Sequence, residues 1–65
     1  MARPARWAIL CIGFDGEQEY VMVGPSPGRV AIFHNKREAQ ENADFLKEGV
    51  AEDYQSINVV RAPKG

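Results

Sequence analysis

The spacing of apolar residues along this chain predicts its secondary-structure elements, and the first part of the chain shows two different spacings. Trp7 to Phe14 is apolar at nearly every position, and Glu17 to Val23 alternates between apolar and polar residues. Both patterns are typical of β-strands. Asp15-Gly16, between them, is a strong short hairpin signal. We therefore expect a β-hairpin with a two-residue turn at Asp15-Gly16.

The middle of the chain carries the signals of a helix. Asn35 is a suitable N-cap, and Glu38 follows three residues later, as in a capping box. Gly49 suits the position just beyond a helix C-terminus. We expect a helix from Lys36 to Glu48, and its apolar stripe consists of Ala39, Ala43 and Leu46.

Short strands are predicted on both sides of this helix, at Val30 to Phe33 and at Ser56 to Arg61. The fold class is then α+β, with one domain over residues 1–65 and the order β-β-β-α-β. The sheet has three to four mainly antiparallel strands, with the helix packed on one face. A three-strand meander whose last strand returns beside the first gives the spatial order 4-1-2-3. Pro27-Gly28 suits a type II turn, and residues 1–5 and 63–65 are expected to be flexible tails.

The two-residue turn would fix the register and sort the strand residues onto two faces. Cys11 would face Tyr20 and Ile9 would face Met22, on a side that ends at Trp7. One helix cannot cover both faces, and we expect it to cover the opposite, aliphatic face. The open face would then bind a partner through Trp7, Ile9, Tyr20 and Met22, with Phe45 contributing from the edge. The alternative is that the faces are reversed and that Trp7 is ordinary core.

The composition and length of the chain favour a protein that associates with another chain. The chain has 65 residues, is 45% hydrophobic and 26% charged, and has a net charge of −1. These values argue against disorder and against a dedicated duplex-DNA binder. A core of this size supplies little stability, and a single cysteine excludes an internal disulfide. We therefore expect a homodimer or a subunit that docks on a protein partner.

The candidate chemistry is sparse. Cys11 and His34 are the only pair that could act as nucleophile and base, and they are also the only strong transition-metal ligands. An apolar strand raises the pKa of a thiol, which opposes catalysis by Cys11. The carboxylates are expected at the solvated surface, except Glu19, which the register places opposite Ile12. We therefore predict a protein that is not an enzyme and that has no metal or cofactor.

A basic cluster lies around the predicted helix N-terminus, where backbone N–H groups favour anions. We take this cluster as a candidate anion-binding site, against the alternative of a solvated basic surface; it comprises Arg29, His34, Lys36 and Arg37. Together with Trp7 and Tyr20, it gives an alternative function as a single-stranded nucleic-acid-binding module. The acidic residues of the hairpin oppose that function.

The sequence has no run of about 20 apolar residues, so we expect no membrane span. A single thiol in a predicted strand suits a reducing compartment, which favours a cytoplasmic location. These observations predict a small, non-enzymatic protein–protein interaction module.

Overall fold

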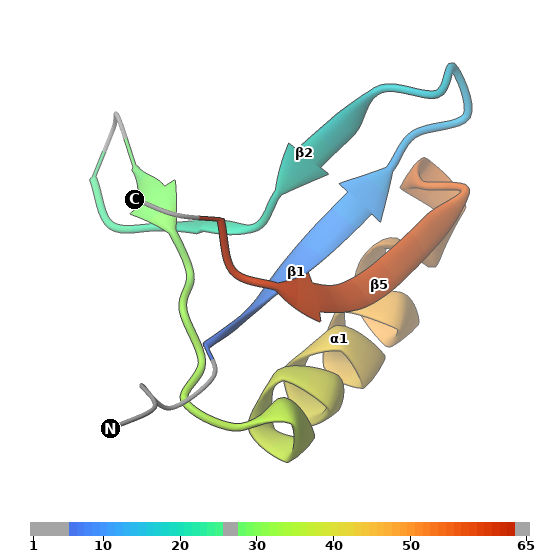
Figure 1. Cartoon of the computed structure of the whole chain (residues 1–65). Helices are drawn as coiled ribbons and strands as arrows, with labels where there is room; N and C mark the ends of the chain where they lie inside the picture. The colour runs from blue at the N-terminus through green and yellow to red at the C-terminus, as the bar shows by residue number, and fades with distance from the viewer. Residues whose placement is uncertain (1–5, 26–27, 64–65) are drawn as a thin grey trace.

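A computed structural model describes residues 6–25 and 28–63 and confirms the α+β class. One helix packs on a small antiparallel sheet (Figure 1). The elements, in chain order, are β1 (Trp7–Ile12), β2 (Gln18–Tyr20), β3 (Met22–Val23), β4 (Arg29–Val30), α1 (Lys36–Val50), the short 3-10 helix η1 (Ala51–Asp53) and β5 (Ser56–Arg61). The predicted last strand is confirmed, whereas the predicted second strand is interrupted at Val21.

The central strand is β1, and the main sheet has the order β2-β1-β5 with both neighbours antiparallel to β1. β3 and β4 form a separate two-stranded sheet, and the chain then returns so that Phe33 bridges Trp7. The neighbours predicted for the first strand are therefore confirmed. The predicted third strand, Val30 to Phe33, is wrong in its bounds, because the strand that forms is β4 at Arg29–Val30. It pairs with the continuation of the second strand, as expected, but in a sheet of its own.

Backbone hydrogen bonds of β1 alternate between its two neighbours. Val21 N–H donates to the Ile9 carbonyl over 2.9 Å, on the β2 side. Ala62 N–H donates to the Arg6 carbonyl over 3.0 Å, on the β5 side. Because bonded residues alternate along an antiparallel strand, odd-numbered residues of β1 bond toward β2 and even-numbered residues bond toward β5.

Gly13 and Glu17, which lie between β1 and β2, form a backbone pair around a three-residue loop, Phe14 to Gly16, so the predicted two-residue turn is wrong. Gly16 N–H donates to the Gly13 carbonyl over 3.0 Å, and Gly13 N–H donates to the Glu17 carbonyl over 2.8 Å. A two-residue turn of type I′ would need positive φ at both Asp15 and Gly16. Only glycines adopt positive φ in the described chain, and Gly16 does so at 88°. The Asp15 carboxylate instead accepts a hydrogen bond from Glu17 N–H.

This loop shifts the hairpin register by one residue from the prediction. Cys11 pairs with Glu19 and Leu10 pairs with Tyr20, whereas we expected Tyr20 opposite Cys11. Because side chains alternate between faces, a shift of one residue exchanges the faces of the second strand. Glu19 therefore shares the face of Cys11, and Tyr20 shares the face of Leu10.

The helix begins where the sequence predicts, because Glu38 N–H donates to the Asn35 side-chain oxygen over 2.7 Å. Its predicted C-terminus is wrong. α1 continues to Val50, so Gly49 lies inside the helix and has no positive φ. The chain does not reverse at Gly49 but continues directly into η1.

The helix covers the Cys11 face of the sheet, and the predicted choice of face is wrong. Ala39 and Ala43 are fully buried, so α1 lies close to β1 and β5. The core cluster of buried residues consists of Ile9, Cys11, Ala43 and Ile57. The reversed arrangement, kept above as the alternative, is the one that forms.

The last strand explains this choice. On the Cys11 face, β5 presents Ile57 and Val59, which continue the apolar surface of β1. On the Leu10 face it presents Ser56, Asn58 and Val60, and the side chains of Ser56 and Asn58 hydrogen bond to each other over 3.0 Å. A helix with an apolar stripe buries more apolar area on the first of these faces. The Leu10 face is half-buried and mixed in polarity, as is usual for the solvated side of an antiparallel sheet.

Residues 1–5 and residues 64–65 of the predicted 63–65 tail, as well as Pro27 of the predicted turn, lie outside the described residues. Among the residues that are described, no helix has both the length and the apolar character needed to cross a membrane.

Candidate functional site

A single helix is too narrow to cover three strands. An α-helix is about 10 Å wide with its side chains, and neighbouring strands lie about 4.8 Å apart, so one helix covers about two strands. α1 packs on β1 and β5. The β2 side of the Cys11 face is therefore left without a helix.

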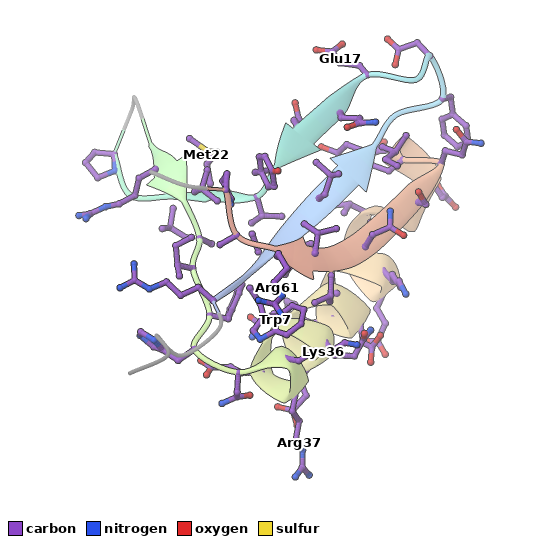
Figure 2. The ribbon with its side chains drawn as sticks, in the orientation of Figure 1. Trp7, Glu17, Met22, Lys36, Arg37 and Arg61 are labelled. Carbon is purple, nitrogen blue, oxygen red and sulfur yellow. The ribbon has the colours of Figure 1, made fainter. Side chains whose placement is uncertain are left out.

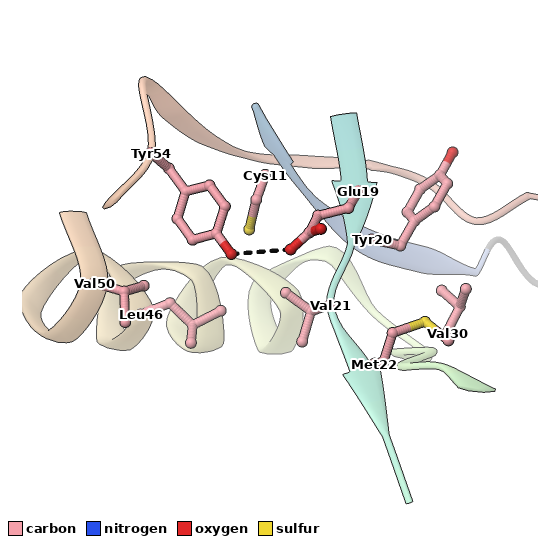
Figure 3. A pocket seen from close by; sticks show the side chains of 9 residues that line it. All are labelled: Cys11, Glu19, Tyr20, Val21, Met22, Val30, Leu46, Val50 and Tyr54. Carbon is pink, nitrogen blue, oxygen red and sulfur yellow. Dashed lines mark hydrogen bonds between the residues drawn. The ribbon is translucent and has the colours of Figure 1, made fainter. Parts of the chain in front are cut away.

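A groove of about 470 Å³ lies at this uncovered position, and we call it the β2 groove (Figure 3). Its lining is mostly apolar and consists of Cys11, Glu19, Tyr20, Val21, Met22, Val30, Leu46, Val50 and Tyr54. Leu46 and Val50 come from the last turns of α1, and Val21 lies across from them between β2 and β3. Cys11, which is 4% exposed, belongs to the buried core beneath.

A polar bridge joins two sides of the groove. The Tyr54 hydroxyl donates a hydrogen bond to the Glu19 carboxylate over 3.0 Å. This hydrogen bond and the negative charge of Glu19 raise the pKa of Tyr54, because both favour the neutral phenol. Tyr54 is held in place by η1 and β5 on either side of it, and Glu19 is turned toward it by the hairpin register.

Cys11 is a structural thiol. Burial, and secondarily the charge of Glu19, raise the pKa of Cys11 above its ordinary value. The thiolate is the nucleophilic form, so this environment opposes reactivity at neutral pH. Cys11 therefore acts as a small apolar side chain beneath the groove.

One end of the groove is acidic. The pairing of β5 with β1 places η1 near the β1–β2 hairpin, since Gln55 N–H donates to the Ile12 carbonyl. Exposed carboxylates gather on these two segments: Asp15, Glu17, Glu19, Glu52 and Asp53. The ion pairs found in the described part of the chain use other carboxylates, those of Glu41 and Asp44 on the helix. A negative field therefore surrounds this end of the groove.

The structure separates the five predicted partner-binding residues. Met22 lines the groove and is 52% exposed, and Tyr20 lines it while its ring points away from the helix (Figure 3). Phe45, 75% exposed, precedes the groove residue Leu46 on α1. Ile9 is 1% exposed in the core, so the expectation that it lies on an open face is wrong.

Trp7 lies away from the groove lining and between two cations (Figure 2). The Lys36 ammonium is 5.5 Å from the ring centroid and the Arg61 guanidinium carbon is 5.2 Å from it. Contacts of this kind contribute about 0.5–1 kcal/mol each at an accessible site. Trp7 therefore joins β1, β5 and the first turn of α1.

The four predicted anion-binding residues have different surroundings. Lys36 contacts Trp7, and Arg37 pairs with Glu41 over 3.6 Å on the exposed helix surface. Arg29 lies in β4, and His34 is exposed before the helix. These contacts do not converge on one binding position.

Trp7 and Tyr20 lie on opposite faces of the sheet, because Trp7 contacts the helix and Tyr20 pairs with Leu10. They therefore cannot form the common stacking surface that the nucleic-acid alternative requires.

Sequence reasoning missed Tyr54, Val21, Leu46 and Val50 as a group. Leu46 was assigned to the helix stripe, and Tyr54 to a connecting segment. The signal that could have found them is the three-residue loop, because it places Glu19 and Val21 on the helix side.

Comparison with known proteins gives no match among protein-family models, curated proteins or solved structures. Within residues 6–25 and 28–63, no group of three His, Cys, Asp or Glu side chains is placed to hold a metal ion.

Proposed function

We propose that this protein is a non-enzymatic protein–protein interaction module that binds an amphipathic helix of a partner in the β2 groove. The observation that carries the proposal is the groove itself, a concave and mostly apolar surface beside the only long helix of the described chain. Apolar concave surfaces of this kind are typical binding sites.

The shape of the groove favours a helix as the occupant. α1 leaves the β2 side of the Cys11 face uncovered, and a second helix beside it would complete the helical layer. Packed helices lie about 8–10 Å apart, which is close to the width of two strands. Leu46 and Val50 would contact the partner from one side, and Val21 and Met22 from the other.

Charge indicates the chemistry of that partner helix. The exposed carboxylates at one end of the groove would attract Lys or Arg residues that flank the apolar stripe of the partner. Tyr54 and Glu19 offer a hydroxyl and a carboxylate at the same end. We therefore expect apolar anchors with basic neighbours.

The absence of catalysis is part of the proposal. It is supported by the burial of Cys11 and by the raised pKa of its thiol, which leave it a poor nucleophile. The free thiol also supports a cytoplasmic location, since reducing compartments maintain such groups.

The test uses isotope-labelled protein and two synthetic helices. One peptide carries leucines at i, i+3 and i+7 with flanking lysines, and the other carries glutamates in place of the lysines. The first peptide is expected to shift the amide resonances of Val21, Met22, Leu46 and Val50, and the second to bind more weakly at low salt. Shifts confined to Leu10, Ile12 and Asn58 would show that the opposite face binds instead.

A matched pair of variants locates the contact. Met22 lines the groove, whereas its neighbour Val23 is equally exposed, at 49%, but lies outside the lining. Met22→Ala should weaken peptide binding by about tenfold through lost apolar contact, and Val23→Ala should leave it unchanged. Equal effects of the two substitutions would contradict the proposal.

A further inference from the structure

Within residues 6–25 and 28–63, β5 forms one edge of the main sheet, because its only neighbour there in the order β2-β1-β5 is β1. Ala62 N–H donates to the Arg6 carbonyl, and bonded residues alternate along antiparallel strands. The even-numbered residues of β5 therefore bond to β1. The backbone N–H and C=O groups of Ile57, Val59 and Arg61 point away from the sheet.

This edge has few of the features that normally prevent pairing. Natural edge strands are protected by central charges, prolines, bulges or very short length. β5 has six residues, Ser-Ile-Asn-Val-Val-Arg, with its one charge at the last position and no proline. Three of them, Ile57, Val59 and Val60, are β-branched and favour strand pairing.

We propose that two copies of this chain pair antiparallel along their β5 edges, around a two-fold axis at Val59. The outward groups lie on Ile57, Val59 and Arg61, which are symmetric about Val59. Val59 would pair with Val59 of the other copy, and Ile57 with Arg61. Every outward N–H and C=O group of these three residues then has a partner, which satisfies the edge completely.

The helices are compatible with this arrangement. α1 lies over β1 and β5, so strand spacings of about 4.8 Å place the two copies of α1 about 10 Å apart, at the usual packing distance. The flank of α1 next to β5 carries Gln40, Asp44 and Lys47, where the Lys47 ammonium is 3.9 Å from the Asp44 carboxylate.

Two further features favour a second copy at this edge: an open depression along β5 and the small core of the single chain. A shallow depression of about 400 Å³ lies along it, lined in part by Lys47, Ile57 and Asn58. The core of the single chain is small, and Ile9 is the one large side chain that is fully buried among the described residues. Association supplies the stability that a domain of this size otherwise lacks. The β2 groove lies on the other side of β1, so both surfaces can be occupied together.

Hydrogen exchange tests the proposal without any substitution. Light scattering should show a dimer that dissociates on dilution. The amides of Ile57, Val59 and Arg61 should exchange slowly when the dimer forms and quickly when it dissociates. The amides of Asn58 and Val60, bonded to β1, serve as internal controls and should be protected in both states. A monomer at the highest concentration, or a dimer in which the three outward amides remain unprotected, would overturn the proposal.

A pair of substitutions at Arg61 distinguishes the contribution of its backbone N–H group to dimerisation from that of its side chain. Arg61→Pro removes one outward N–H from each copy and leaves the bonds to β1 in place. It should raise the dissociation constant of the dimer at least about tenfold, since two hydrogen bonds are lost. Arg61→Ala keeps the N–H and should dimerise like the parent chain. Equal dimerisation by the two variants would contradict β5 pairing, and if Arg61→Pro fails to fold, the hydrogen-exchange result decides.

Discussion

Gly49 occupies a position in α1 where a larger side chain would fit. A Cβ atom added there would meet no other atom within 4 Å, and the residue has no positive φ. Glycine in a helix costs about 0.5–1 kcal/mol relative to alanine, chiefly through backbone entropy. Gly49→Ala should therefore raise the free energy of unfolding by about that amount, measured by urea denaturation. A destabilised variant would show that the last turn of the helix is not helical in solution.

Tyr54 should titrate at unusually high pH. Its hydrogen bond to Glu19, and the charge of that carboxylate, raise the pKa of the phenol in the folded state. The resulting stability is fully present below the unfolded pKa of about 10 and is lost as pH rises through the higher folded pKa. Glu19→Gln removes the charge, so the pKa of Tyr54, followed through its ring resonances, should fall toward the ordinary value. An unchanged titration would mean that the two side chains do not meet.

At the scale of the elements, the sequence predicts correctly those helices and strands whose signals lie within a few residues of each other. Asn35 caps the helix because its side chain reaches an amide three residues away, and Ser56 to Arg61 forms a strand as its composition indicates. The hairpin turn was mispredicted because Asp15-Gly16 suits two loop lengths. The deciding factor is φ, which is positive at Gly16 and not at Asp15.

The loop gives a test of this explanation. Deleting Phe14, which is exposed, leaves Gly13 and Glu17 around Asp15-Gly16, the arrangement of a two-residue turn. Because Gly13 already pairs with Glu17, the strands should keep their register, with Cys11 opposite Glu19. Cross-strand nuclear Overhauser contacts between those two residues would report this outcome. A shift that places Tyr20 opposite Cys11 would contradict it.

At the scale of the molecule, the choice of helix face could not be read from the hairpin alone. It depends on β5, which presents Ile57 and Val59 on one face and the more polar set Ser56, Asn58 and Val60 on the other. That pairing joins segments from opposite ends of the chain, so no local pattern encodes it. The candidate site was predicted only in part for the same reason. Met22 and Tyr20 were identified, whereas Tyr54 reaches the groove through the same long-range pairing.

The pairing of β1 with β5 also determines how the domain would respond to force. Trp7 pairs with Arg61 at one end of the ladder, and the chain enters and leaves the sheet at that same end. A pulling force applied through the segments before Trp7 and after Arg61 would act on one cross-strand pair at a time. The backbone hydrogen bonds between β1 and β5 would then break one after another, starting at that end. Such peeling needs much less force than sliding all the bonds at once. A tether or unfolding machine that acts through those segments would therefore meet the domain along its mechanically weakest direction.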